Sequence, residues 1–90
     1  MKATVKLDGI SRFLAKRKEI VLTVSPNSTW RDVITALAKV APALVGDVIT
    51  RDKRDLVGTL NRSGKISIRD LDAVVVLSED DFLMIVEEAC

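Results

Sequence analysis

The sequence of 90 residues contains no histidine, no tyrosine and one cysteine, Cys90. Without histidine there is no imidazole to act as a general base near neutral pH or to ligate zinc. A single cysteine also excludes an intrachain disulfide. These absences remove most enzyme mechanisms, and we expect a protein that is not an enzyme and that holds no cofactor or metal.

Long apolar segments are missing as well. In residues 1–8 charged and apolar side chains alternate, where a signal peptide would have an apolar core. No apolar run approaches the roughly 20 residues that span a bilayer. One unpaired thiol is compatible with a reducing compartment. We therefore expect a cytoplasmic protein that does not bind membranes.

An excess of charge of one sign is also absent, since 14 Lys and Arg against 13 Asp and Glu leave a net charge of +1. The densest basic cluster comprises Arg12 and 16–18. A nucleic-acid surface would need aromatic side chains among such charges for stacking. The aromatic residues are Phe13, Trp30 and Phe82, and the last two have core-like neighbours. The pattern favours a solvated loop over a nucleic-acid surface.

What is present is a single domain, 1–90, with 48% hydrophobic residues. Residues 2–8 and 19–24 each alternate apolar with polar side chains, which is typical of half-buried strands. Together they predict a hairpin. We expect the connection of about nine residues to be a turn segment that places an apolar side chain under the sheet.

One helix is predicted from residue 29 onward. Thr29 and Asp32 have the spacing of a capping box. Pro42 ends the pattern and allows a short second helical turn. The apolar residues form one stripe at helical spacing: Trp30, Val33, Ile34, Leu37, Ala38 and Ala41.

The second half of the chain predicts a loop over 46–58, two short strands around 60 and 65–68, and a terminal strand over 82–86. The terminal strand is apolar on both faces, so it needs a neighbour on each side. Insertion beside the first strand, in parallel, meets that need. The fold class is therefore α+β, with a mixed sheet and one main helix packed on one face.

Three stretches resemble one family: 7–9 at the end of the first strand, 29–34 at the helix start, and 77–83 at the turn into the last strand. Residues 61–65 resemble the family's hairpin. The family is the ubiquitin-like β-grasp sulfur carriers, which include the small subunit of molybdopterin synthase and the thiamine-biosynthesis carrier. The resemblance implies a β-grasp fold and docking on an adenylating enzyme or a larger synthase subunit.

The C-terminal tail departs from that family. It reads Glu87, Glu88, Ala89 and Cys90, where the carriers end in Gly-Gly so that the terminus can enter a narrow enzyme channel. We expect this tail not to be adenylated as it stands, and acidic neighbours make Cys90 a poor thiolate. The alternative is an interaction module or subunit that has lost carrier activity.

Docking requires a surface, and the last strand supplies a candidate. The side chains of residues 82–86 alternate between the two faces of the sheet. Because one helix covers only one face, one of these two sets points away from the helix. We expect Phe82, Met84 and Val86 to form a docking stripe, or else the interleaved pair Leu83 and Ile85. An alternative is that segment 46–58 folds over the stripe.

Acidic side chains in the turns raise the possibility of acid–base or metal chemistry. They are Asp70, Asp72, Asp80 and Asp81. Turn carboxylates usually cap backbone amides and face solvent, and no base or pocket is evident to pair with these. We expect them to be structural.

Overall fold

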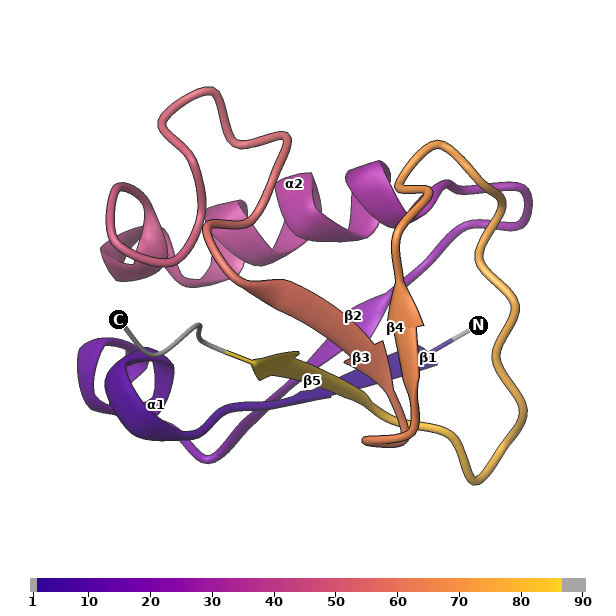
Figure 1. Cartoon of the computed structure of the whole chain (residues 1–90), viewed down its shortest axis with the longest axis horizontal. Helices are drawn as coiled ribbons and strands as arrows, with labels where there is room; N and C mark the ends of the chain where they lie inside the picture. Colours follow the sequence, from indigo (N-terminus) through magenta and orange to yellow (C-terminus); the bar gives the residue numbers. More distant parts are fainter. Residues whose placement is uncertain (1, 87–90) are drawn as a thin grey trace.

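The computed structural model describes residues 2–86. Five strands form one mixed sheet in the order β2-β1-β5-β3-β4, and α2 crosses one face of it (Figure 1). In chain order the elements are β1 (Lys2–Lys6), α1 (Gly9–Ala15), β2 (Glu19–Thr23), α2 (Trp30–Val40), the 3-10 turn η1 (Pro42–Leu44), β3 (Thr59–Arg62), β4 (Ile66–Ile68) and β5 (Leu83–Val86).

The last strand lies at the centre of the sheet, as predicted. β5 runs parallel to β1, with Val5 opposite Leu83, and antiparallel to β3, with Leu60 opposite Ile85. The hairpins β1–β2 and β3–β4 are therefore joined through β5. This is the β-grasp arrangement expected from the apolar character of the terminal strand.

Helix α2 begins and ends as the sequence predicts. The Thr29 hydroxyl accepts from the amide of Asp32 at 3.3 Å, and the Asp32 carboxylate accepts from the amide of Thr29 at 3.0 Å. This reciprocal capping satisfies two donors at the first turn. Pro42 then opens η1. The apolar stripe of α2 faces the sheet and is buried throughout.

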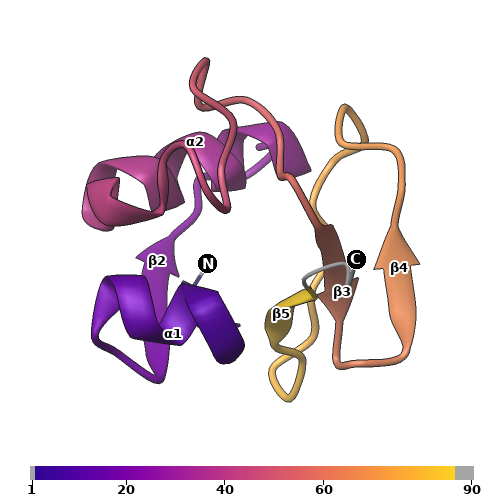
Figure 2. The ribbon, with the colours of Figure 1, turned by 60° about the vertical axis from the view of Figure 1, so that its left-hand side comes forward.

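The prediction of a turn segment between the first two strands is wrong, because residues 9–15 form α1. The Asp8 carboxylate caps it by accepting from the amide of Gly9 at 2.8 Å, and Lys16 ends it with a φ of 57°. Leu14 packs against the core and supplies the expected apolar contact, while Phe13 is exposed. In Figure 2, α1 lies next to the β1–β2 half of the sheet.

Segment 46–58 has no regular helix or strand, but it contributes Val48, Ile49 and Leu56 to the core. It lies beside α2, where the Thr35 hydroxyl donates to the carbonyl of Lys53 at 2.8 Å (Figure 1). The alternative in which this segment covers the docking stripe is therefore wrong. The face of the sheet opposite α2 keeps its exposed side chains.

No helix within residues 2–86 is long and apolar enough to cross a membrane.

Candidate docking surface

Strand β5 divides its side chains between the two faces of the sheet. Leu83 and Ile85 are buried in the core beneath α2. Met84 is half-buried and Val86 is 39% exposed on the opposite face. Of the two sets proposed from the sequence, Met84 and Val86 are thus the ones that face away from the helix.

The register of the sheet extends this surface across all five strands. Met84 lies opposite Lys6 on one side and opposite Asn61 on the other. Lys6 lies opposite Glu19, and Asn61 lies opposite Ser67, so the row is continuous. We call this surface the open face; its members are Thr4, Lys6, Glu19, Val21, Thr59, Asn61, Ser67, Phe82, Met84 and Val86.

Phe82 lies directly before β5 and belongs to the same surface. It is half-buried, and the Lys6 ammonium lies 4.0 Å from the centroid of its ring. A cation over an aromatic face at this distance is a cation–π contact. The lysine therefore covers part of the ring, and the apolar centre of the open face has a cationic border.

Asn61 places an unpaired acceptor in the middle of the open face. Its Oδ1 is buried and has no hydrogen-bond partner among the described residues. Leaving a buried acceptor unpaired costs about 1–3 kcal/mol. The amide of Asn61 therefore lowers the stability of the described fold at the centre of the sheet.

Asp81 fixes the turn that leads into β5. Hydrogen bonds from the amide of Ser78 and the hydroxyl of Ser63, both at 2.9 Å, hold the pKa of Asp81 below its usual range. The amide of Ser63 in turn donates to the carbonyl of Phe82 at 2.7 Å. The Asp81 carboxylate is part of the turn and helps to position Phe82 directly before β5.

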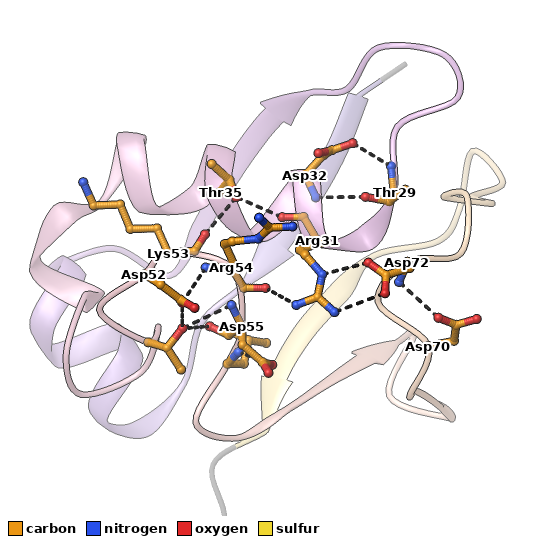
Figure 3. A network of polar contacts seen from close by, with 12 residues as sticks. Thr29, Arg31, Asp32, Thr35, Asp52, Lys53, Arg54, Asp55, Asp70 and Asp72 are labelled. Carbon is orange, nitrogen blue, oxygen red and sulfur yellow. Dashed lines mark hydrogen bonds and ion pairs between the residues drawn. The ribbon is translucent and has the colours of Figure 1, made fainter.

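The other face of α2 carries a polar network that joins three segments (Figure 3). Arg31 Nε donates to Asp72 at 2.8 Å, and Arg31 Nη1 donates to the carbonyl of Arg54 at 2.9 Å. The guanidinium lowers the pKa of Asp72 through this hydrogen bond and through its charge. Asp70 accepts from the amide of Asp72 at 3.1 Å. Arg31 thus ties residues 50–55 to α2 through the carbonyl of Arg54, and residues 70–72 through the carboxylate of Asp72.

Within residues 2–86, no group of three or more acidic or thiol side chains is placed to hold a metal ion. The expectations for Glu87, Glu88, Ala89 and Cys90 fall outside the described residues.

The sequence patterns alone do not predict Lys6 and Asn61 as members of the candidate docking surface. The outward positions of residues 2–6 are visible from their alternation, which is a signal for Lys6. The alignment of Asn61 with Met84 depends on the register between β3 and β5. No local pattern in the sequence reports that register.

No protein-family model matches the chain, and no curated protein matches its sequence. Solved structures do match its fold. The crystal structure of SAMP1 from Haloferax volcanii has a TM-score of 0.80 and 21% identity, over 99% of this chain and 97% of that one. A second crystal structure, of the H. volcanii small archaeal modifier protein 1, has a TM-score of 0.78 and 21% identity, over 98% of both chains.

A Pyrococcus furiosus protein assigned as molybdopterin converting factor, subunit 1, is also similar. Its TM-score is 0.68 at 20% identity, over 93% of both chains. The ubiquitin-like β-grasp fold inferred from the resemblance is therefore confirmed.

Proposed function

We propose that this chain is a small ubiquitin-like carrier or modifier protein, without catalysis of its own, that acts by docking on larger enzymes. The partner class is an adenylating enzyme or the larger subunit of a synthase. The observation that carries the proposal is the open face, with Met84 at the centre of the sheet and no covering helix or loop among residues 2–86. The match to an archaeal modifier protein over 99% of the chain supports it.

The chemistry of the open face suits a protein partner. Met84 and Val86 offer apolar contact area, and the flexible thioether of methionine adapts to different neighbours. Lys6 and Glu19 place charges of both signs beside them in the same row. An apolar centre with a polar border is the usual anatomy of a protein–protein interface.

The type of carrier is part of the proposal. The sequence resemblance includes both molybdopterin and thiamine carriers. The P. furiosus neighbour is named for molybdopterin conversion, and this favours the molybdopterin type. The acceptor of sulfur would then be a molybdopterin precursor held by the larger subunit.

The test replaces Met84 by Asp on the surface that docking would desolvate. The assay uses the adenylating enzymes of the same organism, and it follows ATP–pyrophosphate exchange with two chains: the 90-residue chain and the same chain extended by Gly-Gly. We expect exchange with the extended chain and a loss of at least tenfold on Met84→Asp, because a buried unpaired charge costs several kcal/mol. Val57→Asp, on the exposed loop beside α2, is the matched control and keeps the exchange rate.

Two outcomes contradict parts of the proposal. If neither chain supports exchange but the larger synthase subunit still binds in a Met84-dependent way, the protein is an interaction module without carrier activity. If Met84→Asp and Val86→Asp both leave binding unchanged, the open face is not the docking surface. Circular dichroism of each variant checks whether the fold is retained.

A further inference from the structure

A second surface, on α1, combines cations with an exposed aromatic ring. Phe13 is 81% exposed, the highest value among the large exposed apolar residues. It shares a hollow of about 410 Å³ with the residues around it. We call this the α1 surface, and its lining consists of Gly9, Arg12, Phe13, Lys16, Arg17 and Lys18.

The charge of the α1 surface is not neutralised within the described chain. Residues 9–18 contain four cations and no acid. The ion pair recorded among residues 2–86 joins Arg31 to Asp72, on the α2 side. None of the four cations of the α1 surface is thus paired with a described carboxylate.

Among the described residues, nothing in the fold requires Phe13 to be exposed. The buried side of α1 is formed by Ser11, with Leu14 and Ala15 against the core. Phe13 is exposed and does not belong to this core cluster. A full aromatic side chain in water forgoes the burial of about 150–250 Å². Aromatic and Arg side chains together are the residue types most enriched at interface hot spots.

We propose that the α1 surface is a second docking site, which binds an acidic protein segment with an apolar side chain packed on Phe13. The four cations attract the carboxylates of such a segment, and charge complementarity of this kind raises the association rate and sets the orientation. The hollow receives the projecting side chain beside the ring. The α1 surface adjoins the open face, because Gly9 also lines a hollow with Met84 and Val86, so the test has to show on which of the two surfaces binding acts.

Two other classes of anionic partner fit the surface less well. Single-stranded nucleic acid stacks successive bases on several aromatic side chains, and the α1 surface has one. A lipid surface is bound by long amphipathic helices with an extended apolar face, whereas α1 has seven residues. The hollow beside the single ring of Phe13 has room for one projecting side chain, which a protein segment supplies.

The test selects a displayed library of random twelve-residue peptides on the full chain, with counter-selection on the variant Arg17→Glu/Lys18→Glu. We expect the selected peptides to be rich in Asp and Glu and to share one aromatic or large aliphatic residue. A synthetic copy of the best peptide should lose at least tenfold in affinity on Phe13→Ala, and at least tenfold on Arg17→Glu/Lys18→Glu.

The matched controls change an exposed apolar side chain and two exposed cations outside the α1 surface. Val57→Ala removes another exposed apolar side chain, and Lys65→Glu/Arg69→Glu reverses two other exposed cations. Both should leave the affinity within twofold. In amide NMR spectra of the labelled protein, shifts on peptide addition should concentrate in residues 9–18.

Four results would overturn the proposal: selected peptides without acidic enrichment, no selected peptide at all, an affinity unaffected by Phe13→Ala, or shifts centred on the open face. A single-stranded RNA of twelve nucleotides or phosphatidylserine vesicles that bind as tightly as the peptide would also overturn it, in favour of a general polyanion surface. Because these readouts use no adenylating enzyme, their failure leaves the proposed function untouched.

Discussion

The two faces of the sheet differ more than the sequence of β5 suggests, since all four of its residues are apolar. Leu83 and Ile85 enter the core beneath α2, whereas Met84 and Val86 lie on the open face. On the covered side, α2 and segment 46–58 add further layers, and the Arg31 network ties them together. On the open side, Lys6 lies over Phe82 and Met84 lies near Gly64.

This difference separates the residues that hold the fold from those available to a partner. A side chain on the covered face is surrounded by other apolar groups, so its loss is felt as unfolding free energy. A side chain on the open face has water or a partner on one side. Substitutions on the two faces should therefore report on different properties of the molecule.

The largest effect is expected on the covered face. Leu83→Ala removes a fully buried side chain at the point where β5 lies between β1 and β3. The free energy of unfolding should fall by about 2–5 kcal/mol, through lost burial and the cavity left behind. Urea denaturation measures this. Met84→Ala, one position along the strand, is the control and should cost less than half as much; equal losses would show that the two faces are equally packed.

At Asn61 we expect a smaller change in the free energy of unfolding, and this change is an increase. Asn61→Val removes the buried acceptor that has no partner and places a β-branched residue in β3. We expect unfolding free energy to rise by about 1 kcal/mol, within the range that an unpaired acceptor costs. Thr59→Val on the same strand controls for strand propensity. A decrease for Asn61→Val alone would mean that the amide is hydrogen-bonded in solution.

A weaker effect still is expected from Lys6. Lys6→Met keeps the aliphatic stem and removes the ammonium from the Phe82 ring. An exposed cation–π contact contributes about 0.5–1 kcal/mol, so the loss in unfolding free energy should not exceed that value. Lys2→Met, which is exposed on the same strand, serves as control. A larger loss for Lys6→Met would indicate that the open face is more tightly packed than β5 alone suggests.

The smallest effect depends on pH and falls on the α2 side. The pKa of Asp72 is held below its usual range by the hydrogen bond and the charge of Arg31. A lowered pKa adds stability above the ordinary aspartate range, and this stability disappears as the pH falls through the lowered value. The protection factors of amides in residues 50–55 and 70–72, which are exchange rates corrected for the intrinsic rate at each pH, should therefore fall at acid pH.

Asp72→Asn is the matched variant for this pH effect. The amides of this variant should be less protected at neutral pH, and their protection should fall less on acidification. Part of the change remains, because hydrogen bonds from the Thr50 hydroxyl and the Arg54 amide also lower the pKa of Asp52. An unchanged acid response in Asp72→Asn would assign the whole effect to other carboxylates.

Much of this fold follows from local patterns. The capping residues Thr29 and Asp32, the stripe of α2 and the stop at Pro42 are all short-range signals, and each appears where the sequence places it. The central position of β5 follows from its apolar character on both faces. These features depend on neighbours within a few residues, or on the need to bury a strand.

Other features could not be predicted in this way. Helix α1 has seven residues, too few for a clear period, and Gly9 at its start has the appearance of a strand end. The burial of Ile49 within a charged segment depends on its bridges to Val45 and Leu56. The row that joins Lys6, Met84 and Asn61 exists only once the strands have paired. Long-range register, and not local propensity, creates the candidate site.

The central position of β5 has a consequence for folding during synthesis on the ribosome. The two hairpins share no strand pairing except through β5, which is translated after all the other strands. Until β5 emerges, the facing edges of β1 and β3 have no partner, and their backbone groups are available to chaperones or to other nascent chains. The sheet therefore closes in one late step, and the time until β5 emerges sets how long the edges of β1 and β3 stay unpaired.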